Sequence, residues 1–215
     1  MGPRAVTTVE ADRIRLIDWG VATVALPGQE TSGDGHLVRR LPGGALLAAI
    51  DGLGHGAAAA AAARRAVDTL VQHESETAIG LVRTCHRALA GTRGVTMSLA
   101  SLNAADDTLT WLAIGNVEGV LLRADPRTSR PMETILMRAG VVGLELPRLQ
   151  ATVTSIAPGD TIILATDGIR RSFMEDVRPA AGPQSMADYI LRQFAKGTDD
   201  ALVLVARYRG SENGP

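Results

Sequence analysis

"AAIDGLGHGAAAAAAARR" spans Ala48–Arg65 and decides the fold. Its apolar start continues the run Gly44–Ile50, which is short, unbroken and followed by glycines, and so predicts a buried strand. The alanine-rich part, from Ala57 to about Gln72, has high helix propensity and predicts a helix. A strand therefore ends at Asp51, and a glycine-rich turn separates its carboxylate from the helix.

The composition indicates a globular protein built around small aliphatic residues. The chain has 215 residues, enough for one full-sized domain, and 46% of them are hydrophobic although only 3% are aromatic. The formal charge of −1 gives no general attraction to nucleic acid or to an anionic membrane, so we expect neither as a partner. Cys85 is the only cysteine, which excludes an internal disulfide and favours a packed, inert thiol in a reducing compartment.

The N-terminal sequence predicts a cytoplasmic protein. "MGPRAVTTVEADRIRL" lacks the unbroken apolar core of a signal peptide, and no stretch approaches the roughly 18 apolar residues of a membrane span. With no repeat and no convincing linker, we expect a flexible arm over 1–12, one domain over 13–208, a C-terminal tail over 209–215, and a monomer.

The rest of the chain predicts an α+β fold. A strand that the Trp19-Gly20 pair can interrupt is expected over 13–26, a loop over 27–36, helices over 76–91 and 184–195, and a last strand over 201–208. Between the helices lie short β-rich segments, namely "VTMSLASLN", "TLTWLAIGN", "VEGVLLRAD", "METILMR", "LQATVTSIA" and "TIILATD". Short turns between successive strands favour antiparallel pairing.

Acidic residues recur at the predicted strand ends. They are Asp34, Asp51, Asp167, Asp199 and Asp200. Any one of them fits an ordinary turn, but acids at the ends of central strands can converge on one edge of a sheet. Converging carboxylates repel one another unless protons or cations neutralise them, and oxygen-only ligands select hard divalent ions such as Mg²⁺ or Mn²⁺.

The ordered motifs resemble the PPM-type metal-dependent serine/threonine phosphatases. "GD" at Asp34, "DGLGHG", "TDGI" and "DDALVLV" occur in the family's order, and the likeness runs from about Asp18 to Arg207. "AIGNVEGVLL", "GVVGLELPRLQ" and "APGDTIILATDGI" are most similar to the small stand-alone stressosome phosphatases of the bacterial sporulation and stress-response branch.

The resemblance implies a fold, a metal site and a substrate class. The fold is a four-layer α-β-β-α sandwich with two central, mostly antiparallel sheets and two Mn²⁺ or Mg²⁺ ions at one end. Asp51 would bridge both ions and the Gly52 carbonyl would ligate one of them. Asp167 and Asp199 would hold the other ion, with Asp200 as the alternative to Asp199, and Asp34 would take an outer or extra-metal position. Asp51, Asp167 and Asp199 would be the catalytic residues. The implied substrates are phosphorylated STAS-domain proteins of the stressosome or anti-anti-sigma type.

The sequence departs from the better-known branch of this family and leaves other functions open. That branch has a histidine directly after Asp-Gly where this chain has Leu53, so His55 either faces the site or only shapes the loop. Arg170 and Arg171 are either phosphate ligands or solvated. One alternative is a catalytically silent binding module of the same fold. Another is an ATP-binding anti-sigma-type kinase. The absence of a second glycine-rich lid from the sequence argues against this alternative.

Overall fold

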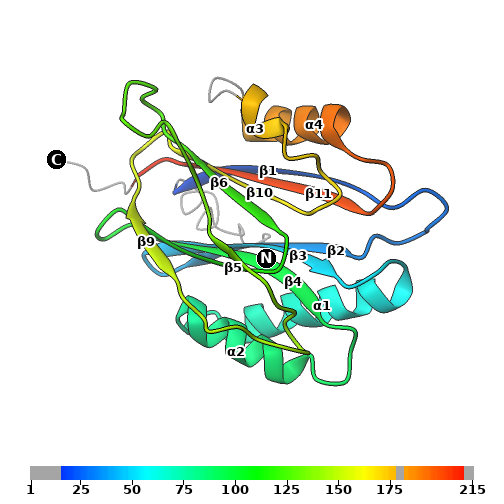
Figure 1. The fold of residues 1–215 in the computed structure, drawn as a ribbon. Helices are drawn as coiled ribbons and strands as arrows, with labels where there is room; N and C mark the ends of the chain where they lie inside the picture. The colour runs from blue at the N-terminus through cyan, green and yellow to red at the C-terminus, as the bar shows by residue number, and fades with distance from the viewer. Residues whose placement is uncertain (1–15, 178–181, 211–215) are drawn as a thin grey trace, which may run out of the picture.

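Two β-sheets pack face to face and helices cover both outer faces, as Figure 1 shows. The computed structural model describes residues 16–177 and 182–210, so the predicted arm over 1–12 and most of the tail lie outside the described residues. The four-layer α-β-β-α arrangement confirms the predicted fold class. Within the described part of the chain, no helix has the length and apolar character needed to cross a membrane.

The first sheet has the strand order β1-β11-β10-β6-β7, and all of its pairs are antiparallel. Its strands are β1 (Ile17–Val24), β6 (Glu118–Leu122), β7 (Met132–Thr134), β10 (Thr161–Ala165) and β11 (Ala201–Tyr208). Strand β1 is continuous, so the expected interruption at Trp19-Gly20 does not occur. Gly20 serves packing instead: a Cβ there would lie 2.3 Å from the Cα of Gln184 in the helix that covers this sheet.

The second sheet has the order β2-β3-β4-β5-β8, and β9 pairs with the same β5. Its strands are β2 (Asp34–Leu41), β3 (Gly44–Gly52), β4 (Val95–Asn103), β5 (Thr108–Ile114), β8 (Met137–Arg138) and β9 (Thr152–Ser155). Only β5 and β8 run parallel among the described pairs, so the sheets are mostly antiparallel, as predicted.

One loop prediction and one strand prediction were wrong. The end of the expected loop over 27–36 belongs to β2, an edge strand whose side chains are mostly half-buried or exposed and therefore give a weak sequence signal. The segment "METILMR" is not one strand, because β7 pairs with the first sheet and β8 with the second.

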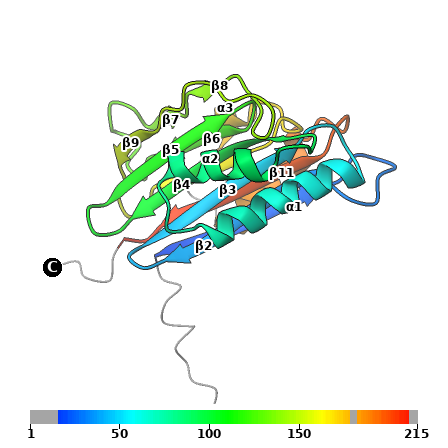
Figure 2. The same cartoon turned by 90° about the horizontal axis from the view of Figure 1, so that it is seen from below.

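Three of the helices, α1 (Ala57–Gln72), α2 (Ala78–Ala88) and α4 (Pro183–Phe194), lie close to their predicted positions, whereas the short helix α3 (Phe173–Asp176) was not predicted. Helices α1 and α2 pack on the second sheet, as the view from below in Figure 2 shows, while α3 and α4 lie over the first. Buried aliphatic residues fill three layers, one between the sheets and one beneath each helical layer. Alanines form much of the contact face of α1, so its backbone lies close to the sheet below it. This close packing fixes the edge where β3 ends and α1 begins.

Candidate metal centre

Asp34 and Asp51 meet because β2 and β3 are antiparallel neighbours. Asp34 opens β2 and is the register partner of Asp51 near the end of β3. The hairpin therefore delivers both carboxylates to one edge of the second sheet. The strand that opens with Asp34 was missed in the sequence, but the acid itself was among the predicted site residues.

The first sheet brings the other three acids to the same end of the sandwich. Asp167 follows β10, while Asp199 and Asp200 directly precede β11, its antiparallel neighbour. Thr166 links the two sheets: its hydroxyl donates a hydrogen bond to Asp34 Oδ2 at 2.8 Å and accepts one from the backbone N–H of Leu202, also at 2.8 Å.

The acids are close enough to raise one another's pKa. Burial, followed by the charge of Asp51, raises the pKa of Asp34 from 3.8 to about 8. Burial, followed by the charges of Asp167 and Asp199, raises the pKa of Asp51 to about 7. Burial and the charge of Asp199 also raise the pKa of Asp167, against the lowering effect of Lys196. The set is therefore a negative cluster with too little positive charge of its own.

The oxygen donors of these acids suit hard divalent cations, although they do not form a complete coordination site in this structure. No three His, Cys, Asp or Glu side chains within residues 16–177 and 182–210 are placed so that they could hold one metal ion. Two of the carboxylates instead accept short hydrogen bonds from neutral side chains, Asp34 from Thr166 and Asp167 from Asn116. Oxygen-only ligands suit Mg²⁺ or Mn²⁺.

Asp199 and Asp200 are adjacent but have different surroundings. Asp200 is buried, and its two carboxylate oxygens accept the backbone N–H groups of Leu26 and Gly33, each at 2.8 Å. Asp199 is only half-buried, and its Oδ1 accepts the N–H of Asp200 at 2.9 Å. Asp200 therefore ties the 26–33 segment to the start of β11, while Asp199 keeps a carboxylate oxygen with no described donor.

The glycine after Asp51 is required by packing. A Cβ on Gly52 would lie 2.3 Å from the carbonyl oxygen of Ala59 and 2.9 Å from that of Gly33. Leu53 and His55 are exposed in the turn that follows, and His55 makes no hydrogen bond or ion pair with any described residue. The turn thus brings backbone, rather than bulky side chains, against Asp51.

Asn116 and Thr96 belong to the site and were missed by the sequence analysis. Asn116 Nδ2 donates to Asp167 Oδ2 at 2.6 Å, and the Thr96 hydroxyl donates to Asn116 Oδ1 at 2.6 Å while lying 3.5 Å from Asp51 Oδ2. Gly115 permits this contact, since its φ is +91° and a Cβ there would lie 2.3 Å from Thr96. The "GN" pair that follows β5 was the available signal in the sequence.

Arg171 is held by a buried acid rather than left fully solvated. Its Nε lies 2.8 Å from Glu118 Oε1, and its own side chain remains largely exposed. Glu118 is buried, and its Oε2 has no hydrogen-bond partner among the described residues. Burial raises the pKa of Glu118, and the charge of Arg171 lowers it.

The comparisons with known proteins agree with this geometry. A family model for stage II sporulation protein E (SpoIIE) matches residues 42–209. The chain belongs to the SpoIIE family of PPM-type phosphatases. It is 22% identical to the phosphoserine phosphatase RsbX of Bacillus subtilis (strain 168) over 142 residues, which are 66% of this chain and 69% of RsbX. The expected likeness to the small stressosome phosphatases is confirmed.

Solved structures with the same fold include RsbX in complex with magnesium. That structure has a TM-score of 0.79 and 20% identity, covering 89% of this chain and 95% of that one. A structure concerned with the bacterial stressosome, as a modular system adapted to control secondary messenger signalling, has a TM-score of 0.81 and 27% identity. That match covers 89% of this chain and 99% of the other.

Proposed function

We propose that the chain is a metal-dependent phosphoprotein phosphatase that removes phosphate from serine or threonine of STAS-domain proteins of the stressosome or anti-anti-sigma type. The observation that carries the proposal is the convergence of Asp34, Asp51, Asp167 and Asp199 at one end of the sandwich. Membership of the SpoIIE family and the similarity to RsbX support the substrate class.

In this proposal two Mg²⁺ or Mn²⁺ ions are held by Asp51, the Gly52 carbonyl, Asp167 and Asp199, with Asp34 further out. Asp200 is assigned to structure, because backbone N–H groups already occupy both of its oxygens. When bound, the cations would lower the pKa of a water molecule and screen the phosphate oxygens.

The chain's own groups would position the ligands and leave the phosphate accessible. Asn116 and Thr96 form a hydrogen-bonded link from Asp167 towards Asp51, and Thr166 holds Asp34. Asp34 and Asp167 are thus each oriented by a neutral side-chain donor that could be released when a cation binds. The turn after Gly52 is exposed at Leu53, Gly54 and His55, so a folded substrate could reach the acids, and selectivity would come from its contacts with the surface around the site.

The test is metal-dependent hydrolysis of p-nitrophenyl phosphate and of an intact phosphorylated STAS domain. We expect turnover with Mn²⁺ or Mg²⁺, its loss in EDTA, and loss in Asp167→Asn but not in Asp188→Asn, which alters an exposed acid on α4. The intact domain should have a far higher specificity constant than a short peptide with the same phosphosite.

Three results would overturn parts of this proposal. Full turnover in metal-free EDTA would disprove the metal mechanism. No hydrolysis of either substrate with any divalent metal would favour the silent binding module. Equal specificity constants for the domain and the peptide would disprove selection by docking.

A further inference from the structure

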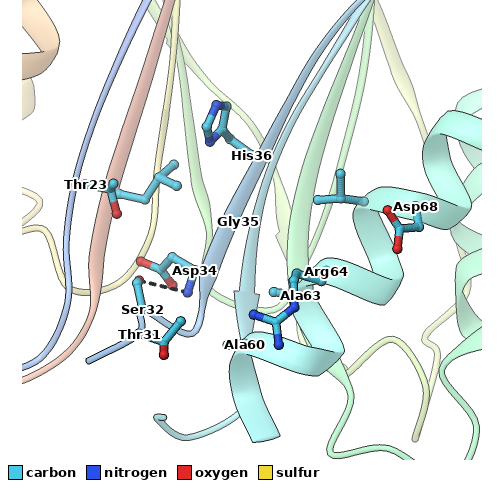
Figure 3. Close-up of a pocket in the computed structure, with 12 residues that line it drawn as sticks. Thr23, Thr31, Ser32, Asp34, Gly35, His36, Ala60, Ala63, Arg64 and Asp68 are labelled. Carbon is cyan, nitrogen blue, oxygen red and sulfur yellow. Dashed lines mark hydrogen bonds between the residues drawn. The ribbon is translucent and has the colours of Figure 1, made fainter. Parts of the chain in front are cut away.

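A pocket of about 460 Å³ opens beside Asp34, between helix α1 and the neighbouring edges of the two sheets (Figure 3). Its volume lies in the range of about 300–1,000 Å³ that is usual for ligand sites. Because Asp34 lines the pocket and also belongs to the acid cluster, the pocket adjoins the candidate metal centre.

The lining of the pocket changes in character along its length. Small apolar side chains of α1 and β11 form part of the wall, namely Ala60, Ala63, Val67 and Leu202. Near Asp34 the wall carries the hydroxyl groups of Thr31 and Ser32. A ligand that fits must therefore combine apolar parts with at least one polar group.

Arg64 is the only lysine or arginine among the residues that line the pocket, all of which the structure describes. Figure 3 shows its guanidinium extending from α1 towards the segment that carries Thr31 and Ser32. It forms no hydrogen bond or ion pair with any described residue, even though Asp68 follows one turn later on α1. An exposed guanidinium without a partner is suited to a carboxylate.

We propose that this pocket binds the segment of the phosphoprotein next to the phosphorylated residue, and that Arg64 selects an acidic side chain in that segment. The inference rests on the proposed function, because it takes the phosphate to lie at the acid cluster. A segment leaving that cluster along the first turns of α1 enters the pocket directly, with apolar contacts to the alanines and its acid at Arg64. Arg64 is then a specificity residue and not a catalytic one.

The test measures binding with two labelled peptides that differ only in charge. Each carries a non-hydrolysable phosphonate analogue of phosphoserine, flanked by glutamates in one peptide and by lysines in the other. Fluorescence anisotropy in Mg²⁺ gives the ratio of the two Kd values for wild type, Arg64→Glu and Arg65→Glu. Arg65 is the matched control, since it is an exposed neighbour on α1 that does not line the pocket.

We expect wild type and Arg65→Glu to bind the glutamate peptide about fivefold more tightly, and Arg64→Glu to reverse the preference. The same ratio in wild type and Arg64→Glu, or no binding of either peptide, would overturn the pocket assignment. Hydrolysis of p-nitrophenyl phosphate by wild type tests the proposed function separately. If Arg64 determines the peptide preference but no hydrolysis occurs, the binding site for an acidic segment is supported and the phosphatase activity is disproved. If hydrolysis occurs without such a preference, the phosphatase activity is supported and the binding site is disproved.

Discussion

Replacing Asp51 by asparagine should remove activity and yet stabilise the metal-free protein. Burial and neighbouring acids raise the pKa of Asp51 from 3.8 to about 7, a shift of about three units at roughly 1.4 kcal/mol each. Ionising Asp51 in the folded, metal-free protein therefore costs up to about 4 kcal/mol. Asparagine has a similar shape and no charge, so it avoids this cost.

The effect of Asp51 on the stability of the metal-free protein depends on pH. Because the folded-state pKa is raised, the cost is absent below about pH 3.8, grows as the pH rises, and is complete above about pH 7. In EDTA at pH 8 we expect Asp51→Asn to raise the Tm by at least 3 °C, since 1 kcal/mol corresponds to about 2–4 °C at this chain length. The gain should shrink at pH 5.

Differential scanning fluorimetry in EDTA and in saturating Mg²⁺ measures both parts of the prediction. With Mg²⁺ the order should reverse, because wild type gains binding energy that the variant lacks. The control is Asp188→Asn, which should shift neither Tm by more than 1 °C or so. A lower Tm for Asp51→Asn in EDTA at pH 8, or near-normal hydrolysis of p-nitrophenyl phosphate, would refute the reasoning.

Three further predictions concern the Asp199-Asp200 pair, Gly115 and Cys85. Asp200→Asn should lower the Tm by several degrees, because two backbone N–H groups lose a charged acceptor. Asp199→Asn should instead abolish metal-dependent turnover with little change in Tm. The reverse pattern would show that Asp200 is the metal ligand and Asp199 the structural residue. Gly115→Ala should destabilise the fold by about 2–4 kcal/mol in urea unfolding, since its φ is +91° and the new Cβ would lie 2.3 Å from Thr96. Burial raises the pKa of Cys85 to about 12, so the native protein should react with a thiol reagent only at the rate of unfolding, and fast labelling under native conditions would contradict this.

The sequence predicted those parts of the fold whose signal is local. The helix from Ala57 to Gln72 was predicted at its observed bounds. An unbroken run of alanines, which have the highest helix propensity, starts directly after the last glycine of the turn. The edge strand Asp34–Leu41 was missed, since burial on only one face leaves charged side chains such as Arg39 and Arg40 that weaken the strand pattern. Which of the two sheets a segment such as "METILMR" joins depends on pairing partners that lie far away in the chain, and this information is not local.

The candidate site shows the same division between local and long-range signals. The acids could be identified one by one because each follows or precedes an apolar strand with glycine close by. Asn116 and Thr96 could not, because their meeting depends on the pairing of β4 with β5 and on the backbone turn at Gly115. A polar residue at a strand end becomes informative only when the register of its neighbours is known.

The Asp199-Asp200 pair explains why one dipeptide can serve both structure and chemistry. Successive residues entering a strand point to opposite faces, so two adjacent acids cannot both enter the same cluster in the same way. Asp200 is directed inward, where Leu26 and Gly33 supply the donors that a buried carboxylate needs. That contact also fixes Gly33, whose successor Asp34 opens β2 opposite Asp51. Asp200, which makes no contact with metal in the proposed site, therefore helps to place Asp34 at the outer side of the acid cluster, opposite the metal ligand Asp51.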